Sequence, residues 1–184
     1  SPGEENEDVL FSLASSSIQF IPTRHEQGAA FMADVWGRLT GKAGVCLATL
    51  GPGATNLVTG IADATLDKSP LVAITGQAGL MRTNRESHQY LDVKNMLAPI
   101  TKWNASIRHP DMIPEMVRKA FKSAQEEKPG AAHLARPIEP RGIGHGIVAS
   151  DAADRHPQPI LHLPSRARGI TQQLAAARVV DEEC

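Results

Sequence analysis

Continuous apolar stretches alternate with amphipathic ones along the first 140 residues of the chain. The runs at 45–50 (VCLATL) and 70–76 (PLVAITG) are almost entirely apolar, which is typical of parallel strands buried on both faces. Between them, apolar residues recur at helical spacing from 57 to 66, until Asp67 to Pro70 break the pattern. This part of the chain therefore predicts a strand, a helix and a second strand.

The flanking segments continue the alternation. Acidic residues ahead of Val9 predict a short opening helix, because carboxylates stabilise the positive end of a helix dipole. Two further helices are predicted, one at 26–39 and one that begins at Asp111 as its capping residue and ends before Lys128. Extended segments are expected at 17–22 (SIQFIP), 100–107 (ITKWNASI) and 130–135 (GAAHLA, a closing strand).

Strands that alternate with helices indicate an α/β domain, with three α/β/α layers and a mainly parallel sheet. Ligands of such sheets bind at the carboxyl ends of the strands, so the positions of interest are 24–27, 51–56 and the segment from Gly76 onward. The polar segment 77–95 has no clear period and is expected to be a long surface connection, which suggests a functional role.

Composition narrows the classes of function. The 184 residues carry 19 Lys and Arg against 20 Asp and Glu without a basic run, so nucleic acid is not an expected partner. No apolar stretch is long enough to cross a bilayer and no signal-peptide pattern opens the sequence, so we expect a cytoplasmic protein without a membrane partner. Cys46 lies in an apolar run and is interpreted as a buried small hydrophobe.

The character of the sequence changes near residue 137. Residues 131–184 contain no aromatic residue and no Lys, but six of the twelve Arg and five of the thirteen Pro. We therefore expect a domain at 1–136 and a linker-like or disordered tail at 137–184. A scrambled or out-of-frame terminus is one hypothesis for the tail.

The helix predicted at 26–39 begins with an acid, Glu26, and otherwise carries mostly small and apolar side chains. Its apolar arc covers about two thirds of the circumference, wider than the ~100° stripe of a surface helix, so we expect burial on several sides, partly by another subunit. Two roles stay open for Glu26: stabilising the first helical turn, or exchanging a proton within a site. His25 is interpreted as a structural histidine, because no Ser or Cys nucleophile motif accompanies it.

The loop at 51–56 (GPGATN) joins a predicted strand to a predicted helix, a place where backbone N–H groups can contact a ligand. It does not match the known phosphate loops. Asn56 occupies the position of the third glycine of a dinucleotide loop, and the Gly-Lys-Ser/Thr end of a P-loop is absent. By itself, the loop is explained as well by a plain tight turn.

Several motifs in order carry a resemblance to a known family. The segment 24–77 (RHEQ to TGQ), followed by ESHQYLDV at 86–93 and APITKW at 98–103, resembles the pyrimidine-binding (Pyr) domain of thiamine diphosphate enzymes. Within these enzymes it is most similar to the acetolactate synthase large-subunit family. The resemblance covers about residues 2–134 and implies the Pyr-domain fold. The family's first strand would precede residue 2, so that strand is expected to be missing.

The resemblance implies roles for individual residues. In the family, a Glu at the position of Glu26 hydrogen-bonds N1′ of the cofactor's aminopyrimidine and so activates the cofactor. The residues implied to lie beside that ring are Pro52, Gly53 and Asn56. Gln89 matches the active-site Gln that faces the substrate from the partner subunit. Phe31 either lines the substrate side or belongs to the core. Thr75-Gly76-Gln77 matches a family motif to which the resemblance gives no role.

The implied reaction is decarboxylation of pyruvate and carboligation to a 2-oxo acid, with thiamine diphosphate as cofactor and FAD in some members. Mg²⁺ would be held by a diphosphate-binding domain whose G-D-G motif does not occur in these residues, and no metal ligand is expected here. That domain is therefore missing or supplied in trans, and the isolated chain is expected to be inactive. A homo-oligomer whose subunits contact each other through the Glu26–Leu39 helix is also implied.

Two alternatives remain open. The chain could belong to another thiamine diphosphate-dependent 2-oxo acid decarboxylase or carboligase. It could instead be a non-catalytic module that pairs with a separate diphosphate-binding chain, or an unstable remnant.

Overall fold

The structure is a computed structural model that describes residues 6–79 and 89–138. Within these residues, four parallel strands form one sheet in the order β1-β2-β4-β3. Their bounds are β1 Gly44–Ala48, β2 Leu71–Ala78, β3 Trp103–Ser106 and β4 Ala131–Ile138. The parallel sheet confirms the predicted α/β fold. GAAHLA, expected as a closing strand, begins β4, the last described strand along the chain, which lies inside the sheet because it pairs with both β2 and β3.

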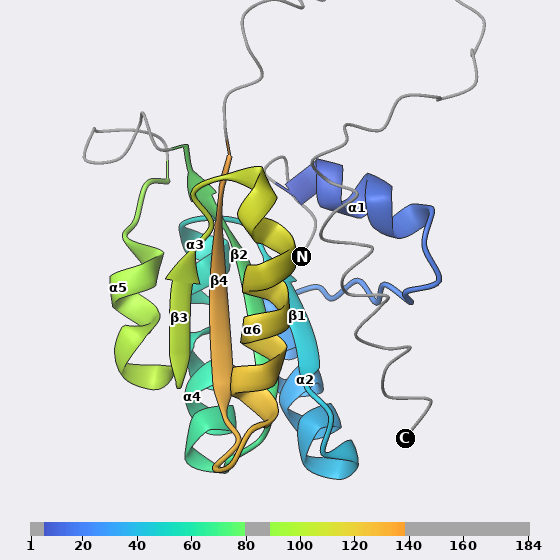
Figure 1. Cartoon of the computed structure of the whole chain (residues 1–184), viewed down its shortest axis with the longest axis vertical. Coiled ribbons are helices and arrows are strands. Elements are labelled where there is room, and N and C mark those ends of the chain that lie inside the picture. Colours follow the sequence, from blue (N-terminus) through green and yellow to red (C-terminus); the bar gives the residue numbers. More distant parts are fainter. Residues whose placement is uncertain (1–5, 80–88, 139–184) are drawn as a thin grey trace, which may run out of the picture.

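Helices cover both faces of the sheet (Figure 1). One face carries α1 (Glu7–Ala14) and α6 (Ile113–Gln125), and the other carries α2 (Glu26–Thr40), α3 (Pro52–Thr55), α4 (Val58–Leu66) and α5 (Val93–Leu97). Short 3-10 helices η3 (Ala98–Ile100) and η4 (Pro110–Met112) precede β3 and α6. Side chains of β2 alternate between the two layers: Ala73 packs with α2 and α4, whereas Val72 and Ile74 pack with α1 and α6.

Two local predictions are wrong. The segment 17–22 forms no strand and pairs with none of the four described strands, and Phe20 and Ile21 are 39% and 54% exposed. An apolar run becomes a strand only where a neighbouring strand completes its hydrogen bonds. Asp111 does not cap α6. It lies within η4, and its N–H donates a hydrogen bond to His109 Nδ1. The rest of the predicted helices and strands occur at or within a few residues of the expected positions.

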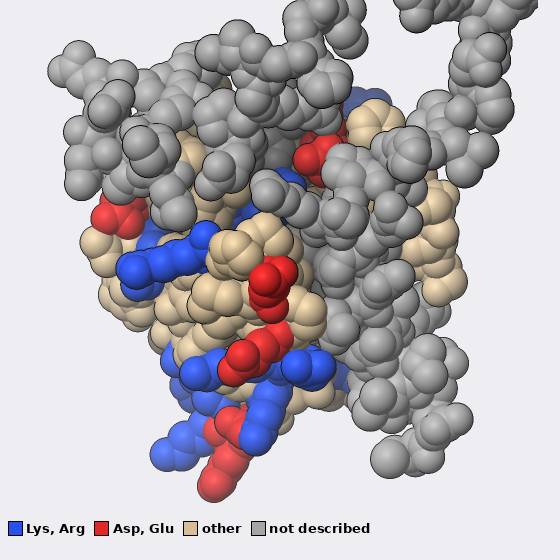
Figure 2. Space-filling view, turned by 45° about the horizontal axis from the view of Figure 1, so that its top comes forward, with Lys and Arg blue, Asp and Glu red and all other residues tan. Residues whose placement is uncertain are grey.

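The surface carries both signs of charge. Figure 2 shows Lys and Arg interspersed with Asp and Glu on the face that it draws. Among residues 6–79 and 89–138, no helix combines the length and apolar character that a membrane span requires. The tail predicted at 137–184 lies almost entirely outside the described residues, since β4 ends at Ile138.

Candidate functional site

Because all four strands are parallel, their carboxyl ends lie at one edge of the sheet (Figure 1). At this edge, β1 leads into the glycine loop and α3, and β2 ends at Ala78. These are two of the three positions that the sequence selects. The third, Glu26, begins α2, which packs on the same face of the sheet as α3.

Glu26 and Asn56 meet at this edge. The amide Nδ2 of Asn56 donates a hydrogen bond to Glu26 Oε2 at 2.9 Å, and both side chains are partly buried. Next to them, His25 is the N-cap of α2, and its Nδ1 accepts a hydrogen bond from the Gln27 N–H at 3.2 Å. This contact agrees with the structural interpretation of His25. The fold thus brings together two predicted cofactor-binding residues that are 30 positions apart in the sequence.

The glycine loop is packed tightly enough that two of its glycines are required. Gly51 has a φ of 56°, and a Cβ at this position would lie 2.6 Å from the carbonyl oxygen of Gln89. A Cβ at Gly53 would lie 2.3 Å from Thr49 Oγ1. Both contacts are shorter than real Cβ atoms allow, so glycine lets the backbone approach closely here. Pro52, exposed at the start of α3, lies between them.

Gln89 lies over the glycine loop of its own chain. Its backbone adopts a φ of 56°, its carbonyl faces Gly51, and its side chain is exposed. The other residues of the ESHQ motif, 86–88, are outside the described residues. The fold therefore places Gln89 next to the predicted pyrimidine-facing residues.

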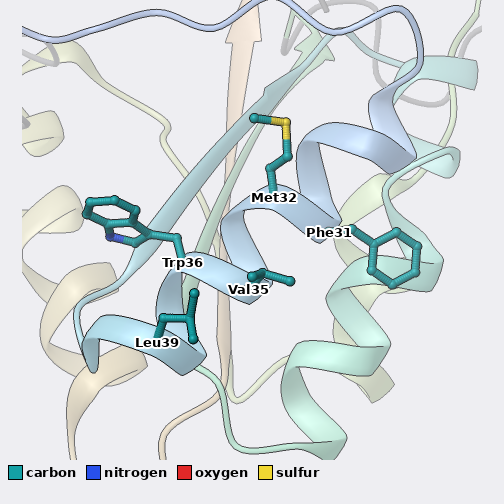
Figure 3. Close-up of a pocket in the computed structure, with 5 residues that line it drawn as sticks. All are labelled: Phe31, Met32, Val35, Trp36 and Leu39. Atoms are coloured by element: carbon teal, nitrogen blue, oxygen red, sulfur yellow. The ribbon is translucent and has the colours of Figure 1, made fainter.

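Phe31 follows Glu26 by five residues on α2, and its side chain is partly buried. Together with Met32, Val35, Trp36 and Leu39 it lines a shallow apolar groove, in which Phe31 and Trp36 point to opposite sides of the helix (Figure 3). Within this chain α2 is buried on one side, and burial of its other sides by another subunit stays a prediction. Only the side of Ala30, Ala33, Asp34 and Gly37 is buried.

Asp34 on α2 is a buried charged residue. Its carboxylate holds the guanidinium of Arg38, which also binds Asp63 and Asp67 at α4. The hydrogen bond to Asp34 raises the pKa of Arg38 above its usual value. This cluster ties α2 to α4 and fixes the helix that carries Glu26.

A buried histidine, His133, links three neighbouring strands of the sheet. His133 on β4 contacts Thr75 Oγ1 on β2 through Nε2 at 2.9 Å and Asn104 Oδ1 on β3 through Nδ1 at 3.0 Å. Asn104 in turn donates to the carbonyl of Lys94 in α5. Burial lowers the pKa of His133 to about 3, so the ring is neutral, with Nδ1 as donor to Asn104. The sequence signal for this residue was a single His within an apolar strand.

The described residues contain no group of three or more His, Cys, Asp or Glu side chains that could hold a metal ion. Cys46 is buried in β1, as the sequence predicts, and burial raises the pKa of its thiol to about 12. The described part of the candidate site contains one carboxylate, a glycine loop and nearby amides.

Comparison with known families decides the assignment. The family model "Thiamine pyrophosphate enzyme, N-terminal TPP binding domain" matches residues 1–96, which include Glu26, the glycine loop and Gln89. The chain belongs to this family. Thiamine pyrophosphate is another name for thiamine diphosphate, so the resemblance recognised in the sequence is confirmed at the level of the family and of its N-terminal domain.

Relatives of the chain are acetolactate synthases. It is 37% identical over 180 residues to "Acetolactate synthase, catabolic" of Raoultella terrigena, covering 96% of this chain and 32% of the relative. It is 47% identical over 126 residues to "Probable acetolactate synthase large subunit" of Methanocaldococcus jannaschii, covering 68% and 21%. It is 47% identical over 116 residues to "Acetolactate synthase isozyme 1 large subunit" of Escherichia coli, covering 63% and 21%. The chain thus spans a third or less of the length of these relatives.

Proposed function

We propose that this chain forms the pyrimidine-facing half of a thiamine diphosphate site in an acetolactate synthase-like enzyme. The observation that carries the proposal is the hydrogen bond between Asn56 and Glu26, next to the glycine loop at the carboxyl end of β1. When bound, thiamine diphosphate supplies an electron sink for decarboxylation of a 2-oxo acid and transfer of the remaining fragment. In this proposal the chain is part of a carboligating transferase rather than a simple binding module.

Glu26 is the residue that would exchange a proton with the ring. Asn56 holds one carboxylate oxygen and so limits the orientations of the side chain. Partial burial strengthens a hydrogen bond from this carboxyl group, because water competes less there. Pro52 and Gly53 would contact the ring, while Gln89 and Phe31 would lie toward the substrate.

The other half of the site has to come from elsewhere. As the family resemblance implies, Mg²⁺ and the diphosphate would be held by a separate domain, with FAD an additional cofactor of that larger assembly. The exposed apolar side of α2 would bind a second copy of the chain. We infer that the chain by itself forms no acetolactate from pyruvate.

Calorimetric titration tests the proposal. Thiamine diphosphate and Mg²⁺ are titrated into the chain alone and into its mixture with the diphosphate-binding domain of a relative. We expect weak binding by the chain and tighter binding by the mixture, and a loss of about 10- to 100-fold for Glu26→Gln, because a charged hydrogen bond is removed. Glu115→Gln, an exposed Glu on α6, is the matched control. Equal affinities for Glu26→Gln and the unaltered chain would contradict the role of Glu26.

A further inference from the structure

Two side-chain oxygens of the described residues are buried without any hydrogen-bond partner, and both belong to segments that enter the candidate site. Thr23 Oγ1 lies three residues before Glu26, and Gln77 Oε1 lies near the end of β2. A buried acceptor without a partner destabilises a folded chain, and native proteins rarely keep one without a reason. Gln77 is the more informative residue, because the family resemblance gives it no role.

The strand geometry places Gln77 on the site face of the sheet. Ala73, Thr75 and Gln77 alternate onto one face of β2, and Ala73 packs there with residues of α2 and α3. Thr75 pairs with Ala48, the last residue of β1, so Gln77 lies beyond β1, at the level where the chain turns into the glycine loop. Gln77 therefore reaches the same edge and the same layer as Glu26 and Asn56.

We propose that Gln77 contacts the ligand of this site, and that its carboxamide oxygen accepts a hydrogen bond from the exocyclic amino group of an aminopyrimidine ring. The inference rests on the proposed function. A lone acceptor needs a donor, and the amino group is the N–H donor that the neutral ring of thiamine diphosphate offers. Glu26, partly buried at the start of α2, would contact a ring nitrogen, so that the two residues would fix the ring through different atoms.

The first test measures stability of the full chain without ligand. Gln77→Met keeps the length of the side chain but removes the unpartnered oxygen, so we expect the Tm to rise by about 3 °C or more. Gln19→Met, the same change at an exposed position, should leave the Tm unchanged. A Tm lowered by Gln77→Met would show that the amide serves the fold, and would overturn the inference.

The second test measures ligand contact directly. Binding of 4-amino-2,5-dimethylpyrimidine and of 2,5-dimethylpyrimidine, which lacks the amino group, is compared by saturation-transfer NMR at millimolar concentration. We expect the unaltered chain and Gln19→Met to prefer the amino compound, and Gln77→Met to lose about 3- to 10-fold of that preference.

The outcomes separate the two proposals. An unchanged preference in Gln77→Met, together with binding that is weakened by Glu26→Gln, would overturn the role of Gln77 and leave the proposed function standing. Absence of binding of both pyrimidines to the unaltered chain would overturn the proposed function and this inference together.

Discussion

At the scale of single residues, His133 shows how a buried polar side chain can constrain the pH range of a fold. Its neutral ring joins β2, β4 and β3 through Thr75 and Asn104. Burial lowers its pKa from the usual 6.5 to about 3. The unfolded chain therefore takes up a proton below pH 6.5 that the folded chain does not, and protonation favours unfolding.

We predict that the free energy of unfolding falls by about 1.4 kcal/mol per pH unit owing to His133 as the pH drops from about 6.5 toward 3. His133→Gln should flatten this slope, whatever its effect on stability at neutral pH. His109→Gln, at an exposed histidine, should keep it. Urea unfolding at several pH values measures both, and an unchanged slope in His133→Gln would contradict the prediction.

Residue-level reasoning from the sequence selected residues that the fold brings together, but it did not indicate the side chains that support them. The resemblance pointed to Glu26, Asn56 and Gln89, and the fold brings Glu26 to Asn56 and Gln89 to the glycine loop. Burial of Asp34 could not be foreseen, because it depends on a helix that follows about 30 residues later. The network of His133 joins three strands, so no local pattern indicates it.

At the scale of elements, α2 has two unlike sides. Small residues let neighbouring backbone approach on one side, where a Cβ at Gly37 would lie 2.4 Å from the carbonyl oxygen of Pro70. On the other side, Met32, Val35, Trp36 and Leu39 are exposed. Periodicity predicted the helix and the width of its apolar arc. It does not indicate which part of that arc packs against the rest of the chain and which part stays exposed.

We predict that the exposed side of α2 drives self-association. Leu39 is 81% exposed on this side, and Leu39→Glu should shift the chain toward the monomer by placing a charge in the contact. Leu66 is 75% exposed at the end of α4, and Leu66→Glu is the control. Sedimentation velocity over a range of concentrations would detect the change, and identical profiles for both variants would exclude α2 as the contact.

The elements that the sequence predicted well are those whose pattern is local. The amphipathic helix α6 and the apolar strands β1 and β2 follow the periodicity of the chain. The segment 17–22 has an equally apolar pattern but does not form a strand, because a strand also depends on its neighbour.

At the scale of the whole molecule, one thiol can report on opening of the core between the sheet and α2. Cys46 is 2% exposed, and burial raises the pKa of its thiol to about 12. The reactive thiolate is therefore almost absent while the fold is intact.

We predict that alkylation of Cys46 by iodoacetamide at pH 8, in a Cys184→Ser chain, is at least about 100-fold slower in native buffer than in denaturant. The urea concentration that exposes Cys46 should coincide with the midpoint measured by circular dichroism. Rapid labelling in native buffer would mean that β1 opens separately from the rest of the sheet.

The central position of β4 has a consequence for synthesis of the chain. β3 pairs with β4 among the described strands, and β2 uses β4 as its second neighbour. During synthesis β3 is therefore made before its partner, and the four described strands can form one sheet only after β4 has emerged. Until then the nascent chain keeps apolar strand edges exposed, a condition in which aggregation competes with folding.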